Sequence, residues 1–551
     1  MNEPIKIFST DVLVIGGGIA GLVAANKAAD QGASVLIAEK STAGWGGQMP
    51  ISGGFFMTLP EDHIEAMIKL SAEAGEYLND QDFLTAFMKS TYPCVQEMAD
   101  WGVPFEKRMD GKLKLIMGEF SNIPRVETGL PALLSRAMRL GVKVINKLYM
   151  VDLLKHDGRI SGAVGFHYQT GEFMVIKAKT IILACGGCMY KTRPLWHMNC
   201  GEGVAMAYNA GAEMRNAEFA NMFHIANKIT LDDAGASIDP CEHLIANALG
   251  EKLSEKYNLK SDQPPCKAIM AAIKEIESGR GPLYLDVTQH SDLFGLGGHP
   301  AIGEQEHGYA KMMQRKGIDI SREKVEWEIV PEFHAGPIRV DLTCETTVPG
   351  LYAVGDSVFH GSGWIGALDW YRGRPLVLAA VTGLWAGTAA GKKAADVPDP
   401  EFNISEIEEL RKEIFAPLGK ENGLDPYKAI KDIQEVIFKI KNSYSKNGDR
   451  LENALGKIEK IKSELPDLAA RDSHELVRCY EAKSMITSGE LLYRASLMRT
   501  ESRGSNIRED FPERDDKNWL KWLIIRKDGN RMKLWTEPVP INRYQYKPSQ
   551  V

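Results

Sequence analysis

The sequence has little cysteine, no long apolar run and no excess of basic residues. Eight cysteines among 551 residues do not form a disulfide framework, which predicts a reducing, cytoplasmic location. The N-terminus lacks a basic region before an apolar stretch, so we expect no signal peptide. The longest apolar run, residues 376–391, is too short to span a bilayer and rich in small residues, which favours a buried helix. A net charge of −7 argues against nucleic acid as an electrostatic partner.

The cysteines also lack the spacing of a metal or iron–sulfur site. Cys185 and Cys188 form one C-x-x-C pair, and Cys200 follows at a distance that does not match a four-cysteine cluster. The pair is therefore either a redox-active dithiol or two thiols at the end of a buried strand. Since no H-E-x-x-H or comparable spacing occurs, we expect no metal site.

The order of the patterns predicts several domains. Strand and glycine-turn patterns begin the chain and return at "VPGLYAVGD", so residues 1–216 and 328–400 are expected to form one discontinuous domain. Residues 217–327 have the mixed pattern of an inserted α+β domain. Residues 401–530 are charged and helical, with "ISEIEELRKEIF" and "RLENALGKIEKIKSEL" as the clearest amphipathic stretches, and residues 531–551 form an extended tail.

The first domain begins with a dinucleotide-binding signature. Gly16, Gly18 and Gly21 form G-x-G-x-x-G between an apolar strand and a helix. This spacing allows a tight turn, a close approach of backbone to a pyrophosphate at the helix N-terminus, and helix–strand packing. Glu39 ends the second strand, where a carboxylate can accept hydrogen bonds from a ribose diol.

A second element far along the chain favours FAD over a nicotinamide cofactor. A strand that ends at Gly355 and Asp356 would bring a carboxylate and backbone amides to the other end of the dinucleotide. This pairing of an N-terminal strand–helix–strand unit with a distant "GLYAVGD" resembles flavoproteins with two dinucleotide folds.

Further motifs resemble the succinate dehydrogenase/fumarate reductase flavoprotein family. They are "WGGQMPISGG", "TIILACGG", "GEGVAMAYNAGAE", "GRGPLYLDVT" and, most specific, "RTESRGSNIREDFPERDDKNWLK". "YKTRPLWHMNCGEGVAMA" is also similar to the α-subunit of adenylylsulfate reductase. The resemblance implies an α/β fold with a Rossmann-like FAD-binding domain, a mobile capping domain in the inserted segment and a C-terminal helical domain.

The resemblance also gives a role to the glycine-rich loop after the second strand. In the membrane-bound relatives this loop carries a histidine covalently linked to flavin, but that place falls on Gly47 here, so we predict non-covalent FAD. Gly46 and Gly47 would let amides approach the ring, and Gln48 or Ser52 would bond its N5 or pyrimidine edge. Trp45 either packs on the domain or contacts flavin or substrate. The residues expected at the cofactor are Gly16, Gly18, Ile19, Ala20, Gly21, Glu39, Lys40, Gly46, Gly47, Gln48, Ser52, Gly53, Gly54, Gly186, Gly355 and Asp356.

The match to the family weakens at the substrate site. "PEFHAG" places His334 on a substrate-binding histidine, but the family's arginine acid is not found between residues 217 and 330. Trp364 stands roughly where a second carboxylate-binding arginine would be. Arg372 and Arg374 follow, and they either bind an anionic ligand or begin a helix. His334, Trp364, Arg372 and Arg374 are therefore the candidates for the catalytic site.

Three functions remain open from the sequence. The leading one is an FAD-dependent oxidoreductase that reduces or forms an activated double bond in a small organic acid. Its electrons would come through a separate, ferredoxin-like iron–sulfur subunit, because the chain has no cluster or haem motif. The second is a chemistry like that of adenylylsulfate reductase, with sulfite adding to flavin N5 and AMP as the other partner. The third is a non-catalytic flavin relay in a larger complex.

Overall fold

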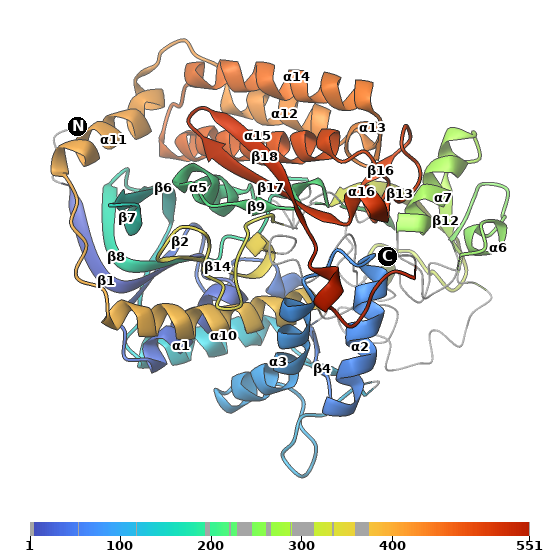
Figure 1. Cartoon of the computed structure of the whole chain (residues 1–551), viewed down its shortest axis with the longest axis horizontal. Coiled ribbons are helices and arrows are strands. Elements are labelled where there is room, and N and C mark those ends of the chain that lie inside the picture. Colours follow the sequence, from blue (N-terminus) through green and yellow to red (C-terminus); the bar gives the residue numbers. More distant parts are fainter. Residues whose placement is uncertain are drawn as a thin grey trace.

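The computed structural model describes residues 5–52, 54–116, 118–192, 199–219, 222–228, 245–259, 266–286, 288, 313–332, 336–358 and 374–549. Three layers are visible in Figure 1: a central sheet, a pair of long helices below it, and a group of C-terminal helices above it. A smaller sheet with its own helices lies at one side. The α/β class expected from the sequence is confirmed.

The central sheet is built around five parallel strands. In spatial order these are β5 (Lys143–Asn146), β2 (Val35–Glu39), β1 (Lys6–Ile15), β8 (Phe173–Leu183) and β14 (Leu351–Ala353). The first half of β8 (residues 173–177) pairs antiparallel with β7 (Arg159–His167), which in turn pairs antiparallel with β6 (Leu148–His156) at the edge of the sheet. Residues 12–15 of β1 are at most 5% exposed, as expected for a parallel strand covered on both faces.

Two long helices pack side by side beneath this sheet, α1 (Ile19–Asp30) and α10 (Arg374–Ala395). Gly383, Gly387 and Gly391 recur every four residues on α10 and face α1. A Cβ at Gly387 would lie 2.4 Å from the Ala24 carbonyl oxygen, so only glycine allows this close approach. The expectation of a buried helix at residues 376–391 is confirmed. Within the described residues, no helix combines the length and apolar character needed to cross a bilayer.

The part of the chain between β8 and β14 contains the smaller sheet. Its antiparallel strands are, in order, β10 (Met222–Asn227), β13 (Val325–Glu332), β12 (Leu283–Leu285) and β11 (Ile245–Ala246). Helices α6 (Leu253–Lys256) and α7 (Cys266–Glu277) accompany it, at the right of Figure 1. Strand β13 runs through residue 327, where the sequence pattern ends the inserted segment. The domain limits therefore remain a prediction.

The C-terminal region consists of helices and a hairpin. Its main helices are α11 (Ile404–Phe415), α12 (Pro426–Ile437), α14 (Gly448–Glu464) and α15 (Ser473–Met498). Each begins after an Asn or Asp side chain that accepts a hydrogen bond from a backbone N–H of the first turn. Strands β17 (Lys521–Asp528) and β18 (Arg531–Pro538) form the hairpin, which pairs with β9 (Met214–Arg215). The predicted C-terminal helical domain is confirmed, but its predicted limit at residue 530 falls inside this hairpin, so residues 521–528 are a strand and not helix.

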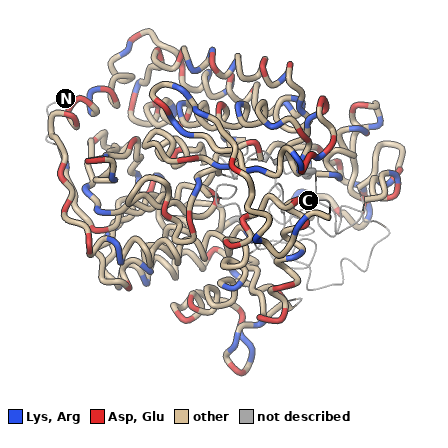
Figure 2. The backbone as a smooth tube through the Cα atoms, viewed as in Figure 1, with Lys and Arg blue, Asp and Glu red and all other residues tan. Residues whose placement is uncertain are grey.

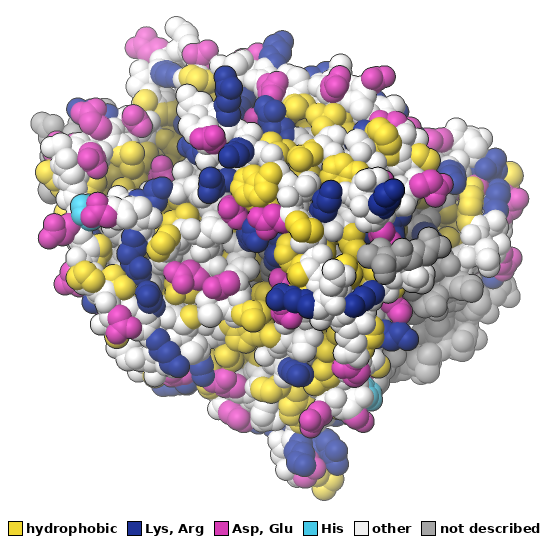
Figure 3. Space-filling model, in the orientation of Figure 1, with side chains coloured by type: hydrophobic (Ala, Val, Ile, Leu, Met, Phe, Trp, Pro, Cys, Tyr) yellow, Lys and Arg dark blue, Asp and Glu magenta, His cyan; other side chains and the backbone are white. Residues whose placement is uncertain are grey.

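Shorter elements complete the fold around these layers. They are β3 (Phe55–Met57), α2 (Glu61–Ala74), α3 (Gln81–Asp100), β4 (Phe120–Asn122), α4 (Gly129–Arg139), α5 (Glu202–Ala210), α13 (Ile440–Ser443), β15 (Ser445–Lys446), β16 (Ile507–Arg508) and α16 (Asp516–Trp519). Acidic and basic residues are interspersed along the backbone in Figure 2. On the face shown in Figure 3 they are intermixed with hydrophobic side chains, so this face carries no region of a single charge.

The contact between α1 and α10 gives a matched pair of substitutions. Gly387→Ala should lower the stability of the protein by about 1–3 kcal/mol, because the new methyl group would press on the Ala24 carbonyl. Gly456→Ala in α14, where a Cβ meets no atom within 4 Å, should instead raise it by about 0.5–1 kcal/mol. Denaturant unfolding followed by circular dichroism measures both. Equal effects of the two changes would contradict the close approach.

Candidate functional site: a dinucleotide cavity

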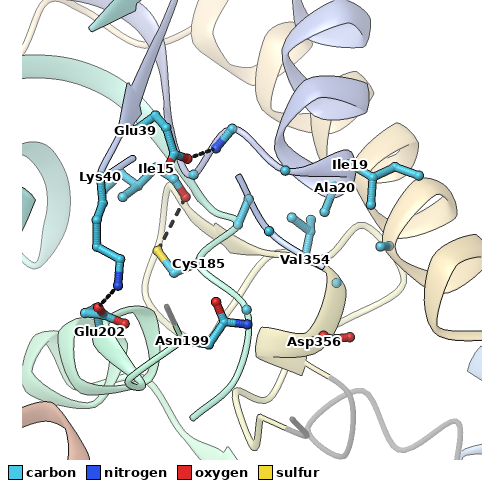
Figure 4. A pocket seen from close by; sticks show the side chains of 18 of the residues that line it. Ile15, Ile19, Ala20, Glu39, Lys40, Cys185, Asn199, Glu202, Val354 and Asp356 are labelled. Atoms are coloured by element: carbon cyan, nitrogen blue, oxygen red, sulfur yellow. Dashed lines mark hydrogen bonds and ion pairs between the residues drawn. The ribbon is translucent and has the colours of Figure 1, made fainter. Parts of the chain in front are cut away.

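A cavity of about 1010 Å³, including its mouth, lies at the carboxyl ends of the parallel strands. Its walls come from the residues that directly follow β1, β2, β8 and β14, with further residues from α1, α5 and α10. Figure 4 shows these side chains converging on one space. In open α/β sheets this edge is where ligands bind.

The glycines in the turn after β1 have two different roles: some allow close packing, and one leaves room for a ligand. A Cβ at Gly16 would lie 2.3 Å from the Ala184 carbonyl oxygen, and one at Gly21 would lie 1.9 Å from the Gly16 oxygen. Gly18 has no such neighbour, since the nearest atom to a Cβ there would be 3.9 Å away, at Gly47. Gly18 also precedes α1, whose first turn has no side-chain cap. The backbone N–H groups there remain available to a pyrophosphate.

Glu39 fixes this turn to the end of β2. Its carboxylate accepts hydrogen bonds from the Gly17 N–H at 2.5 Å and from the Ser41 N–H at 2.6 Å, and the Ser41 hydroxyl donates to it at 2.9 Å. The side chain is only 7% exposed. Glu39 therefore holds together the two loops that enclose one end of the cavity (Figure 4).

Tyr149, in β6, brings an unused donor to the cavity wall. The residue is 2% exposed, and its hydroxyl has no hydrogen-bond partner among the described residues. Burial, with the charges of Glu202 and Glu481 nearby, raises the pKa of Tyr149 well above its ordinary value, so the hydroxyl stays protonated. A buried donor without a partner is costly. An acceptor on a ligand bound in the cavity would remove that cost, and the residues present therefore fit a polar cofactor at this place.

A buried network of charges closes the side of the cavity beyond Glu39. The Lys40 ammonium lies 2.5 Å from Glu202 and 3.7 Å from Glu481. Lys191 and Arg478 reach Glu481 at 2.9 and 2.5 Å. Burial alone would raise the pKa of Glu481, but these three cations lower it to about 2. Glu481 is therefore ionised at neutral pH, and the network joins the end of β2 to helices α5 and α15.

The comparisons with known proteins identify what this cavity binds. Residues 11–368 match the FAD binding domain model, and residues 432–551 match the model for the C-terminal part of the fumarate reductase flavoprotein. The chain belongs to the succinate dehydrogenase/fumarate reductase flavoprotein family. It is an FAD-dependent oxidoreductase.

Individual relatives match over almost the whole chain. An uncharacterized FAD-dependent oxidoreductase of Methanocaldococcus jannaschii is 27% identical, covering 97% of this chain and 99% of the relative. One subunit of the fumarate reductase (CoM/CoB) of Methanothermobacter marburgensis is 23% identical, with 95% and 98% covered. Among solved structures, an E. coli quinol fumarate reductase flavoprotein superposes with a TM-score of 0.85 at 21% identity, covering 99% of both chains. Adenylylsulfate reductase of Archaeoglobus fulgidus gives 0.79 at 21% identity, covering 98% and 97%.

Most of the residues expected at the cofactor line this FAD cavity. Those that do are Gly16, Gly18, Ile19, Ala20, Glu39, Lys40, Gly47, Gln48, Gly186, Gly355 and Asp356. Gly21 instead packs the helix on the turn, and Gly46 lies where a Cβ would be 2.6 Å from the Ser41 hydroxyl. Ser52 donates to the Met49 carbonyl and accepts from the Gly54 N–H, within its own loop. Gly53 lies outside the described residues.

Sequence reasoning missed Tyr149, Asn199 and Glu202 on the cavity wall. The only available signal was for Glu202, which begins α5 within the quoted "GEGVAMA" motif.

Cys185 also lines the cavity, and its thiol donates to the Ile15 carbonyl at 3.4 Å. Burial raises the pKa of Cys188 to about 12, which disfavours the thiolate that a redox-active C-x-x-C requires. Trp45 is 61% exposed, so it does not pack into the domain.

Of the four catalytic candidates, only Arg374 belongs to the described part of the chain. His334, Trp364 and Arg372 lie outside the described residues. Arg374 begins α10 and is 1% exposed, and its guanidinium donates to the Ser71 hydroxyl at 2.9 Å and to the Met67 sulfur at 3.1 Å. Both partners belong to α2. In this structure Arg374 therefore ties α10 to α2 and does not line the FAD cavity.

Cys200, Glu202 and Glu481 bring three potential metal ligands within 4.8 Å of one another. The same carboxylates already face Lys40 and Lys191, whose ammonium groups supply the positive charge that a metal ion would bring. We therefore assign this cluster to the ion-pair network.

The unpartnered hydroxyl of Tyr149 predicts that its removal weakens FAD binding without lowering the stability of the apoprotein. Tyr149→Phe should weaken FAD binding about two- to tenfold, while leaving the apoprotein as stable or more stable, because a buried donor without a partner is removed. The control is Tyr493→Phe in α15, whose hydroxyl is within 3.0 Å of the Ser443 hydroxyl and donates to the Val436 carbonyl. This change should destabilise the protein without altering FAD affinity. Flavin fluorescence titration and unfolding curves measure both properties, and unchanged FAD affinity in Tyr149→Phe would exclude the contact.

Proposed function

We propose that this flavoprotein transfers hydride between flavin N5 and a double bond of a small organic acid. The observation that carries the proposal is the match over 95% of the chain to one subunit of a fumarate reductase (CoM/CoB), supported by further relatives named as fumarate reductase and succinate dehydrogenase flavoprotein subunits. Bound FAD supplies the two-electron chemistry of its isoalloxazine ring. The protein supplies binding, orientation and charge.

The residues of the cavity suit distinct parts of the cofactor. The first turn of α1 would hold the pyrophosphate through its N–H groups. Glu39 keeps the two enclosing loops in place, and Tyr149 would donate a hydrogen bond to the adenosine half. Gly47 and Gln48 would face the flavin half, with the Gln48 amide 3.4 Å from the Met189 sulfur. These contacts bind and orient the cofactor.

We propose that the FAD is held without a covalent bond. Gly47 occupies the place of the histidine that links to flavin in the membrane-bound relatives, and no histidine is among the described residues that line the cavity. Acid precipitation should therefore release all flavin into the supernatant. Flavin that stays with the precipitated protein would contradict this proposal.

We also propose that electrons reach the flavin through a separate iron–sulfur subunit. The described cysteines are mostly buried and scattered over several elements, and their positions do not form a four-thiolate cage. Relatives of this chain carry names of flavoprotein subunits, in keeping with a division of electron transfer between chains.

A second candidate is chemistry like that of adenylylsulfate reductase. The specific observation in its favour is Trp364, which stands where the family has a carboxylate-binding arginine. Loss of such an arginine removes charge-assisted hydrogen bonds worth about 1.5–3 kcal/mol each to a dicarboxylate. An aromatic residue there suits a flatter ligand that stacks.

One anaerobic experiment separates the two candidates. The bound flavin is reduced, fumarate is added in excess, and the oxidised flavin absorbance is followed. The leading proposal predicts rapid recovery. No recovery with fumarate, together with reversible bleaching of oxidised flavin by sulfite, would replace it with the second candidate.

His334 gives a separate test of the organic-acid site. His334→Ala should slow turnover about ten- to hundredfold, the effect of losing a charge-assisted hydrogen bond to substrate, while the FAD content stays unchanged. Steady-state kinetics with flavin quantification measures both. Full turnover in the variant would remove His334 from the mechanism.

A further inference from the structure

A second cavity lies next to the FAD cavity and shares Lys40 and Ser41 with it. It has a volume of about 620 Å³, including its mouth, and the other lining residues come from the loop after β7, the loop after β8 and the start of α15. They are Tyr168, Lys191, His474, Val477, Arg478 and Glu481. Figure 4 shows Lys40 turned away from the glycine turn and toward Glu202. The shared lysine therefore forms part of the boundary between the two cavities.

The lining of this second cavity is cationic. Its described lining residues include Lys40, Lys191 and Arg478 and one carboxylate, that of Glu481, while Glu202, which pairs with Lys40, lines the FAD cavity instead. Both oxygens of Glu481 are engaged, because Oε1 faces Lys40 and Oε2 accepts from Lys191 and Arg478. The Glu481 side chain is only 2% exposed, whereas Arg478 and Lys40 are 29% and 26% exposed. Arg478 is therefore the most exposed of these charged side chains, and Glu481 the least.

The same cavity has an aromatic wall. The rings of Tyr168 and His474 meet edge to face, with centroids 5.1 Å apart. The backbone N–H of Tyr168 donates to the Lys147 carbonyl at 3.1 Å, which fixes the position of the tyrosine on the loop after β7. A held aromatic ring beside a cationic surface suits a planar group that carries an anion.

We propose that the second cavity binds a phosphate group, with Arg478 as its main contact and Tyr168 as the platform for the ring of a nucleotide. Arginine presents several donors in a planar fork that matches phosphate geometry. This cavity adjoins the dinucleotide cavity and shares Lys40 and Ser41 with it, and the proposal requires neither a particular substrate nor a particular reaction.

The test uses the full-length protein loaded with FAD. Isothermal titration calorimetry is carried out with AMP, inorganic phosphate and adenosine as probes, and the flavin absorbance is recorded throughout. We expect saturable binding of AMP and of phosphate, much weaker binding of adenosine, and no release of FAD. AMP binding tighter than phosphate indicates a nucleotide as the source of the phosphate group, and equal binding indicates the free anion.

Two arginines near the start of α15 form a matched pair of substitutions. Arg478→Gln should weaken AMP and phosphate at least about tenfold, because a charge-assisted bond is lost. Arg471→Gln removes an arginine of the same region that pairs with Glu475 at 2.7 Å and does not line the cavity. It should leave binding within about twofold of the parent. Equal effects of the two changes would overturn the assignment.

A third variant keeps the proposal testable if Arg478→Gln fails to fold. Tyr168→Leu should weaken AMP about five- to tenfold, through the loss of stacking, and leave phosphate binding unchanged. Absence of binding by both probes at millimolar concentration would refute the site. Release of FAD by AMP would also refute it, because the ligand would then be occupying the dinucleotide cavity.

Discussion

The close approach of three backbone segments at Gly16 and Gly21 is the constraint on which the FAD site depends. Gly16 brings the turn after β1 against the residue that follows β8, and Gly21 brings the first turn of α1 against Gly16 itself. Side chains at these two positions would separate β1, β8 and α1. The cavity at the carboxyl ends of the strands would then lose the helix N-terminus that faces it.

The same constraint extends outward through α10. Its glycines at residues 383, 387 and 391 let it pack directly on the backbone of α1, and the start of α10 contributes to the cavity wall. The N–H of Gly355, in the turn after β14, donates to the Thr382 hydroxyl of α10 at 2.9 Å. Helix α10 thus joins α1, which follows the N-terminal glycine turn, to the second element of the flavin site at Gly355.

The most specific family motif forms a buried charge network rather than a cofactor contact. Arg499 pairs with Glu218 at 2.7 Å and with Glu501 at 2.8 Å, and Arg503 pairs with Glu501 at 2.7 Å, all with fully buried side chains. Burial lowers the pKa of the neighbouring Lys446 to about 7. Removing one partner of a buried pair leaves an uncompensated charge, at a cost of about 3–5 kcal/mol.

Local features of the fold could be predicted from the sequence, and long-range contacts could not. The unit from β1 to β2, the buried helix α10 and helices α11 and α14 follow from periodicity and glycine spacing within short windows. The unused hydroxyl of Tyr149 and the burial of Arg374 under α2 depend on neighbours far away in the chain. The hairpin of β17 and β18 likewise crosses residue 530, where helical patterning gave no sign of a strand pair.

Lys40 links the two cavities through its charge. Its ammonium is shared between Glu202, which lines the FAD cavity, and Glu481, which lines the second cavity. Burial would lower the pKa of Lys40, but Glu202 and Glu481 raise it above its ordinary value, so the charge is fixed and only its position can change. An anion that drew Lys40 toward the second cavity would leave Glu202 less compensated beside the cofactor. The ion pair with Glu202 at 2.5 Å opposes such a movement, which keeps Lys40 at the boundary between the two cavities.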